Sequence, residues 1–185
     1  MATKQTVIGV VGMPASGKTV VAEYLAKKQG AMRIHLGAFI WNWLKNRGVK
    51  PSEEAGLMAS LYLWAEYGDI PIANWAINQI KNAKNKKLII IDSLRTVDEA
   101  RAFQLRYGGN FHIIAVLASP AVRLKRAQSR ARFGSLSKLE FRMRDREELR
   151  LGVGDLIASS NHYIDGNQNI ASVKKQADAI LKHLS

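Results

Sequence analysis

The chain has 185 residues, of which 47% are hydrophobic and 23% are charged, a balance that is typical of a globular protein and argues against intrinsic disorder. It contains no cysteine, which excludes disulfide frameworks, thiolate metal sites and a cysteine nucleophile. Lys and Arg outnumber Asp and Glu by 28 to 15, and the net charge of +13 favours attraction to polyanions such as nucleotides, nucleic acid or an acidic membrane.

Short apolar runs alternate with longer segments of helical periodicity along the chain. The predicted strands are 6–11, 31–35, 88–92, 111–117 and 163–165. The predicted helices are 18–29, 37–47, a segment that follows Ser52, 71–83, 96–107, 119–132, 137–151 and 170–184. Strands that alternate with helices imply parallel strands joined by right-handed crossovers. We therefore predict an α/β fold, a three-layer α/β/α sandwich around a parallel five-stranded sheet.

Capping residues mark several of these helix boundaries. Ser52 is followed by two glutamates, which favour the positive end of a helix. The pairs Thr96–Glu99 and Ser137–Glu140 match the capping box, in which a hydroxyl and a carboxylate each accept a hydrogen bond from a main-chain N–H group. These signals predict three helix starts without reference to apolar periodicity.

The length favours a single domain over residues 1–185, with a core formed by 1–36 and 84–185. The segment 37–83 is helical and interrupts the alternation of strands and helices, so we expect it to form an excursion on the substrate side. Apolar runs such as IIAVLA at 113–118 are much shorter than the roughly 18 residues of a membrane-spanning helix. No membrane partner is expected, and a cytoplasmic location is predicted because the sequence shows no convincing export signal.

The clearest motif is GMPASGKT, which follows the first apolar strand and opens the first helix. Its pattern, G-x-x-x-x-G-K-T, is that of the phosphate-binding loop, or P-loop. Glycines let several main-chain N–H groups of such a loop point at one anion, and the positive end of the following helix adds to the attraction. We expect Lys18 to reach the β- and γ-phosphates of ATP, and Thr19 to place its hydroxyl on Mg²⁺. The predicted nucleotide contacts are Gly12, Met13, Pro14, Ala15, Ser16, Gly17, Lys18, Thr19 and Val20.

A carboxylate ends the apolar run LIIID, where Asp92 is the last residue. The carboxyl ends of parallel strands form the edge at which ligands bind in open α/β sheets. P-loop chemistry calls for an acid on a neighbouring strand that holds Mg²⁺. Asp92 is therefore predicted to be a metal ligand and a catalytic residue that orients the acceptor, in preference to a solvated strand-end carboxylate.

Three segments resemble the archaeal adenylate-kinase-related proteins, which belong to the nucleoside-monophosphate-kinase branch of P-loop NTPases and are sometimes called dephospho-CoA-kinase-like. The first is VIGVVGMPASGKTVVAEYLAKKQG at 7–30, and the second is LIIIDSLRTVDEARAFQ at 88–104. The third, RDREELRLGVGDLIASSNHYID at 144–165, is the most specific to the family because generic ATPases lack it. The resemblance implies a P-loop NTPase core that binds ATP at 12–19.

On the acceptor side, the resemblance implies a pocket formed by the helical excursion 37–83. Arg95 falls where this branch has an arginine that touches the acceptor's phosphate. Gly37 and Trp41 fall on the same side and are predicted to contact the substrate. All four tryptophans of the chain lie in this part of the sequence, and we interpret most of the aromatic residues here as packing, with Trp41 as the exception.

The resemblance also implies a short lid near 126–137. Arg126 and Arg130 fall in it and are predicted to be catalytic, because guanidinium groups neutralise charge on a phosphoryl group in transfer. For Arg132, a role in the lid and a place on a solvated basic surface are equally favoured. The neighbours Arg144 and Asp145 are expected to form an internal ion pair that shapes the nucleotide site.

The sequence departs from the branch in the stretch GAFIW, where the branch has G-D-x-x-R. Ala38 and Trp41 replace the carboxylate and the cation, which argues against a monophosphate acceptor held in the usual way. Arg33 or Arg47 are the alternative cations. Ser93 replaces a glycine next to Asp92.

These features predict an ATP- and Mg²⁺-dependent phosphotransferase that passes the γ-phosphoryl group to a nucleotide or a nucleotide-like small molecule, with AMP among the candidates. Two alternatives stay open. The residues at 38 and 41 motivate a nucleotide-binding switch or slow ATPase that has no small-molecule acceptor. The net charge motivates an ATP-using protein that associates with RNA or DNA, which we do not favour because charge is a poor guide to function.

Overall fold

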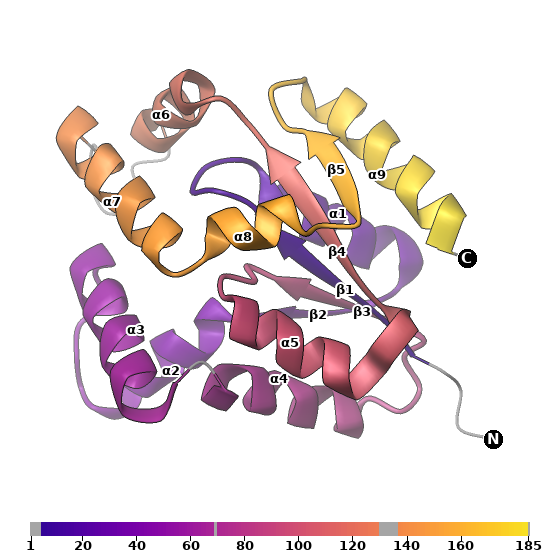
Figure 1. Ribbon diagram of the computed structural model, residues 1–185, viewed down its shortest axis with the longest axis horizontal. Coiled ribbons are helices and arrows are strands. Elements are labelled where there is room, and N and C mark those ends of the chain that lie inside the picture. Colours follow the sequence, from indigo (N-terminus) through magenta and orange to yellow (C-terminus); the bar gives the residue numbers. More distant parts are fainter. Residues whose placement is uncertain (1–4, 69, 130–136, 185) are drawn as a thin grey trace.

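The fold was analysed in a computed structural model that describes residues 5–68, 70–129 and 137–184 (Figure 1). Five strands form one sheet in the order β2-β3-β1-β4-β5, and every neighbouring pair is parallel. The strands are β1 (Thr6–Val11), β2 (Met32–His35), β3 (Leu88–Asp92), β4 (Phe111–Leu117) and β5 (His162–Asp165). This arrangement confirms the predicted α/β fold with a parallel five-stranded sheet.

Helices connect the strands and cover both faces of the sheet. They are α1 (Lys18–Gln29), α2 (Gly37–Asn46), α3 (Glu53–Tyr67), α4 (Ile70–Asn82), α5 (Val97–Tyr107), α6 (Pro120–Ser129), α7 (Lys138–Arg150), α8 (Val153–Ala158) and α9 (Ile170–Leu184), with a 3₁₀ turn at Gly108–Asn110. Helices α1 and α9 pack on one face, and α4, α5 and α8 pack on the other. Figure 1 shows α6 and α7 beyond the ends of the strands. None of the helices in the described ranges is long and apolar enough to span a membrane.

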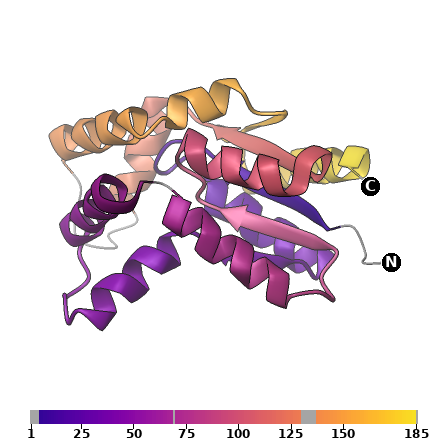
Figure 2. The same cartoon turned by 60° about the horizontal axis from the view of Figure 1, so that its bottom comes forward.

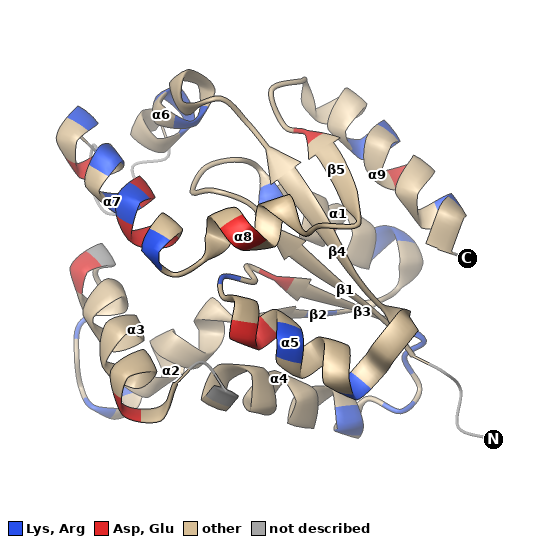
Figure 3. Cartoon of the chain, viewed as in Figure 1, with Lys and Arg blue, Asp and Glu red and all other residues tan. Residues whose placement is uncertain are grey.

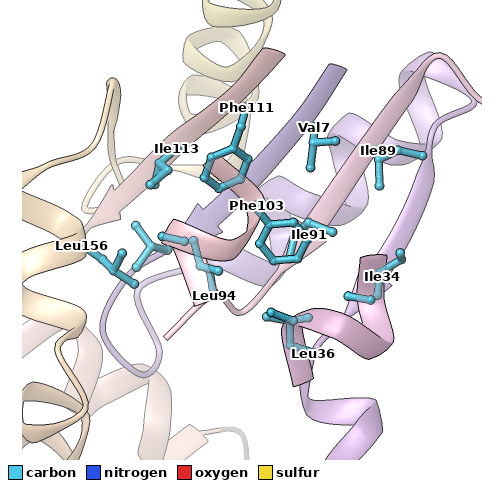
Figure 4. Close-up of a cluster of buried hydrophobic side chains, with 14 of the residues drawn as sticks. Val7, Ile34, Leu36, Ile89, Ile91, Leu94, Phe103, Phe111, Ile113 and Leu156 are labelled. Carbon is cyan, nitrogen blue, oxygen red and sulfur yellow. The ribbon is translucent and has the colours of Figure 1, made fainter. Parts of the chain in front are cut away.

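The core explains why the strands read as continuous apolar runs. Val7 and Val11 of β1 pack into the cluster beneath α4, α5 and α8, whereas Ile8 and Val10 pack into the cluster beneath α1 and α9. Successive side chains of a strand point to opposite faces, so a strand covered on both sides must be apolar at every position. Figure 4 shows the first cluster, in which Phe103 stacks on Phe111 with ring centroids 5.5 Å apart.

The predicted caps are confirmed. Ser52 Oγ accepts a hydrogen bond from the Ala55 N–H group, and complete capping boxes form at Thr96 and Ser137. Helix α8 was not predicted from the sequence, because six residues are too few to show apolar periodicity. Of the helix predicted over 119–132, α6 covers the part up to Ser129, and the remainder lies outside the described residues.

The predicted excursion 37–83 divides into two parts. Helix α4 belongs to the sheet layer, since Ala73, Ala76 and Ile80 are fully buried in the cluster under α5. Helices α2 and α3 extend away from the sheet (Figure 2) and share a small core of their own. That core contains Ile40, Leu44, Ala59 and Leu63. The part of the excursion that projects is therefore the α2–α3 pair.

Candidate functional site

The P-loop joins β1 to α1 in a conformation that only small residues adopt easily. The φ angles are 155° at Gly12, 61° at Ala15 and 106° at Gly17. A Cβ atom on Gly12 would lie 2.6 Å from both Ser16 Oγ and the Val116 carbonyl oxygen, so this position requires glycine. The N-cap of α1 is Gly17, which has no side chain to cap the helix, and no acidic residue lies in the first turn. The first N–H groups of α1 are therefore left for an anion.

Ser16 gives a second indication that the loop is shaped for a ligand. Its hydroxyl is buried, and it makes no hydrogen bond with any residue in the described part of the chain. Buried polar groups are rarely left without a partner, because their desolvation is costly. A loop with uncommitted N–H groups, an unpartnered hydroxyl and an adjacent lysine fits a triphosphate.

Lys18 is half-buried at the start of α1. Burial lowers the pKa of its amine from 10.5 to about 8. Glu148 and Asp92 counteract this shift, and Arg95 adds to it. The carboxylate at the end of β3 and the guanidinium of Arg95 are thus each close enough to act on the amine of the loop.

Asp92 is fully buried at the carboxyl end of β3, beside Val10 of β1. Arg33 Nη2 donates a hydrogen bond of 2.6 Å to its Oδ2 atom, and His35 Nδ1 lies 3.3 Å from the same oxygen. Ser93 Oγ donates to Oδ1 over 3.2 Å. Burial by itself would raise the pKa of the Asp92 carboxyl, but His35 and Arg33 bring it below its ordinary value. The carboxylate is therefore ionised at neutral pH, as a metal ligand must be.

Neither partner of Asp92 was assigned to it from the sequence. The sequence indicates Arg33 only as an alternative cation on the acceptor side, and it indicates no role for His35. The register of the sheet supplies the missing signal, because His35 of β2 is directly opposite Asp92 of β3. Arg33 lies two residues earlier and therefore points to the same face.

Ser93 lies in the left-handed region, with a φ angle of 69°. Apart from Ala15 it is the only residue other than glycine with a positive φ in the described ranges. The glycine of the related pattern thus corresponds to a main-chain conformation that Ser93 adopts at some cost in energy.

A buried arginine supports the P-loop from behind. Both terminal nitrogens of Arg123 donate to the carboxylate of Asp145, over 2.7 and 2.6 Å, and Nη1 also donates to the Pro14 carbonyl oxygen. The Arg123 side chain is 4% exposed. Asp145, which is predicted to pair with its neighbour Arg144, has Arg123 of α6 as a bidentate partner. A bidentate pair of this kind fixes the loop through Pro14.

Arg126 lies one turn further along α6. Its guanidinium donates to the carbonyl oxygens of Ser16 and Gly166, over 3.2 and 2.7 Å. A Cβ atom on Gly166 would lie 2.6 Å from the Ser16 carbonyl oxygen, so the loop after β5 passes directly against the P-loop. The structure thus places Arg126 beside the predicted nucleotide site, where it ties two loops together. Arg130 and Arg132 lie outside the described residues.

A pocket opens between the α2–α3 pair and the start of α5. Gly37 and Arg95, two of the three residues that are predicted to contact the substrate, line it. Trp41 does not line it and lies instead against Gly56 of α3, where a Cβ atom would come within 2.6 Å of its ring. Trp64, which the sequence predicts to be a packing residue, lies in the pocket wall.

Known proteins resemble this chain over almost its whole length. A UPF0200 protein of Methanothermobacter thermautotrophicus is 33% identical over 180 residues, which cover 97% of this chain and 90% of that protein. A second UPF0200 protein, from Methanosarcina barkeri, is 33% identical over 178 residues, which cover 96% of this chain and 95% of that protein. The chain belongs to the UPF0200 family. Its residues 8–149 also match the family described as an AAA domain, which makes this UPF0200 protein a P-loop protein.

Solved structures agree with the fold of the UPF0200 protein. A shikimate kinase from Acinetobacter baumannii in complex with shikimate superposes with a TM-score of 0.60 at 14% identity, covering 98% of this chain and 94% of the kinase. A gluconokinase from Sinorhizobium meliloti superposes with a TM-score of 0.62 at 18% identity, covering 100% and 95%. These similarities show that the UPF0200 protein has a P-loop kinase fold.

Charge in the UPF0200 protein is dispersed. Figure 3 shows Lys and Arg on α6, α7, α9 and the turn before β3, with acidic residues among them on α5, α7 and α8. No three His, Cys, Asp or Glu side chains come together as a metal cluster within the described ranges. The candidate site of the protein consists of residues 12–20, Asp92 and Arg95.

Proposed function

We propose that this UPF0200 protein binds ATP with Mg²⁺ at the P-loop and transfers the γ-phosphoryl group to a small molecule in the pocket beside Arg95. One observation carries the proposal. Asp92 ends β3 beside Val10 of β1, the strand that leads into the P-loop, and Arg95 lies three residues later in the pocket wall, so the groups for the nucleotide, the metal and the acceptor lie at one edge of the sheet. A phosphoryl group in transfer has to meet all three.

The chemistry needs positioning and charge stabilisation more than proton transfer. An oxygen of the acceptor attacks the γ-phosphorus, and a new O–P bond forms as the bond to the β–γ bridging oxygen breaks. ADP leaves with that electron pair, and any proton on the attacking oxygen passes to solvent. Lys18 stabilises the negative charge on the γ-phosphoryl oxygens, and the N–H groups of the P-loop hold the β-phosphate in line.

Thr19 and Asp92 are the oxygen donors that would hold Mg²⁺, which would neutralise charge on the β- and γ-phosphates. Two protein oxygens suit this ion, because it usually keeps several waters and takes further ligands from the substrate phosphates. Arg33 and His35 keep the Asp92 carboxylate ionised and fix its orientation. In this scheme Arg126 holds the shape of the P-loop through Ser16.

Labelled ATP and a panel of acceptors test the proposal. Acceptor-dependent transfer of the label is expected with at least one small molecule, and AMP, CMP, dephospho-CoA, shikimate and gluconate form a suitable first panel. Lys18→Met should abolish transfer while the folded protein remains intact. Release of phosphate at a rate that no acceptor changes would contradict the transferase.

The second candidate is a nucleotide-binding switch or slow ATPase. It is favoured by Ala38 and Trp41, which replace the carboxylate and the cation of the related pattern. The same assay separates the two functions, because a switch hydrolyses ATP without transferring the label to any acceptor.

A further inference from the structure

The polar groups that line the acceptor pocket are nearly all engaged within the protein. Ser60 Oγ donates to the Gly56 carbonyl oxygen over 2.8 Å, and Ser93 Oγ donates to Asp92. Thr96 Oγ1 accepts from the Glu99 N–H group in the capping box. A ligand that enters the pocket therefore meets few hydroxyl groups that lack a partner.

Glu99 is engaged in the same way. Its Oε2 atom accepts from the main-chain N–H groups of Arg95 and Thr96, over 2.9 and 3.3 Å, and only 3% of the residue is exposed. This carboxylate holds the start of α5 in place. It is not a partner for the hydroxyl groups of a sugar.

Arg95 differs from the other polar residues of the pocket. It is the only basic residue among those described as lining it. Nη2 of its guanidinium forms an ion pair with Glu148 Oε1 over 3.7 Å, longer than a hydrogen bond, and 35% of the side chain is exposed. Beside this ion pair, the N–H groups of the guanidinium can donate to one anionic group of a ligand.

The remaining wall is apolar. Leu36 and Ile40 come from the β2–α2 segment, Ile72 from α4 and Leu151 from the end of α7. Trp64 presents a ring that is half exposed. A wide aromatic face beside one guanidinium is suited to a flat ring that carries a single negative charge.

The pocket is narrow in this structure. Its volume is about 40 Å³, well below the roughly 300–1,000 Å³ of typical ligand pockets, so its walls have to move apart to admit even a compact ligand. A nucleoside monophosphate would bring a dianion, two ribose hydroxyls and the polar edge of a base. Most of these groups would lose water without gaining a partner, which weakens binding.

We infer that the pocket takes a compact aromatic or largely apolar molecule with one anionic group, which stacks on Trp64 and pairs with Arg95. The choice of this pocket as the acceptor site rests on the proposed function. The chemical class of the ligand rests on the lining residues alone, so it can be tested without nucleotide.

The experiment is a calorimetric titration of the full chain with 4-hydroxybenzoate, with its neutral analogue 4-hydroxybenzyl alcohol, and with AMP. We expect saturable binding of the acid, and binding at least about tenfold weaker for the alcohol, because a charge-assisted hydrogen bond is lost. Arg95→Gln should reduce the difference between acid and alcohol to less than about twofold. Trp64→Ala should weaken both by about tenfold, because both lose the stacking surface.

Tyr62→Ala is the matched control, because Tyr62 lies on the same helix, is 50% exposed and does not line the pocket. It should leave both affinities unchanged. Equal binding of acid and alcohol, absence of saturable binding of the acid, or tighter binding of AMP that Arg95→Gln and Trp64→Ala abolish would each overturn the inference. If the protein binds the acid but no ATP, the proposed function is refuted and the ligand class stands. If it binds ATP but no acid, the ligand class is refuted and the proposed function stands.

Discussion

The P-loop and the acceptor pocket lie at the same edge of the sheet but are built in different ways. The P-loop is held by main-chain geometry and by buried, charged contacts, such as Arg123 with Asp145. The acceptor pocket is formed by side chains of α2, α3 and α5, and its aromatic wall is half exposed. One side of the site is therefore a main-chain loop that buried contacts fix in place. On the other side, the chemistry of the pocket depends on which side chains face inward.

The largest effect on turnover is expected at the P-loop. Lys18→Met removes the only side-chain cation of the P-loop motif and should reduce turnover by a factor on the order of 10³ or more. The thermal midpoint should not fall, because burial disfavours the charged amine in the folded protein. Steady-state kinetics and a thermal melt check both expectations, and a variant that retains wild-type turnover would contradict the role of Lys18.

The support behind the P-loop should be the next most sensitive feature. Arg123→Met leaves the Asp145 carboxylate without its bidentate partner, which should cost about 3–5 kcal/mol in the free energy of unfolding. Denaturant unfolding measures this loss. Arg150→Gln, which breaks the exposed pair with Glu147, is the control and should cost less than about 1 kcal/mol. Equal losses for the two variants would show that Arg123 does not support the loop.

The two tryptophans Trp41 and Trp64 on the acceptor side should differ in how much each stabilises the protein. Trp41→Ala leaves a gap against Gly56 and should destabilise the protein by about 2 kcal/mol, because a large side chain is removed from the small core of α2 and α3. Trp64→Ala should cost less than about 1 kcal/mol, since half of the side chain is exposed. Unfolding curves of the two variants would contradict the assigned positions if Trp64→Ala proved the more destabilising.

The smallest expected effect concerns the main chain beside Asp92. Ser93→Gly removes the cost of a left-handed conformation and should be more stable than Ser93→Ala by about 1 kcal/mol. Both variants lose the hydrogen bond to Asp92, so the difference isolates the conformation. If the two variants unfold at the same denaturant concentration, the position is not strained.

The P-loop and the strands were predictable because each depends on local rules. A G-x-x-x-x-G-K-T motif after an apolar run specifies main-chain geometry, and capping boxes at Thr96 and Ser137 specify helix starts. The tertiary partners were not predictable in this way. Arg33 and His35 reach Asp92 only because β2 pairs with β3, and Arg123 reaches Asp145 only because α6 lies against α7.

The acceptor side shows the same limit in its aromatic residues. The family pattern predicts a substrate contact at Trp41, but the ring of this residue lies against Gly56 of α3. Trp64 of α3 lies in the pocket wall. Helix α3 is apolar on several faces, so periodicity does not reveal which face meets a ligand. The direction of a helix face is set by packing, which one sequence does not specify.

Calorimetry with Mg²⁺ and ATP at pH 7 and pH 8.5, each in two buffers of different ionisation heat, tests the central claim most directly. A triphosphate beside Lys18 raises the pKa of an amine that titrates near 8, so proton uptake on binding should be small at pH 7 and larger at pH 8.5. The account predicts saturable binding with this pH-dependent uptake, and its loss in Lys18→Met. Absence of saturable binding by the folded protein, or uptake that is unchanged in Lys18→Met, would contradict it.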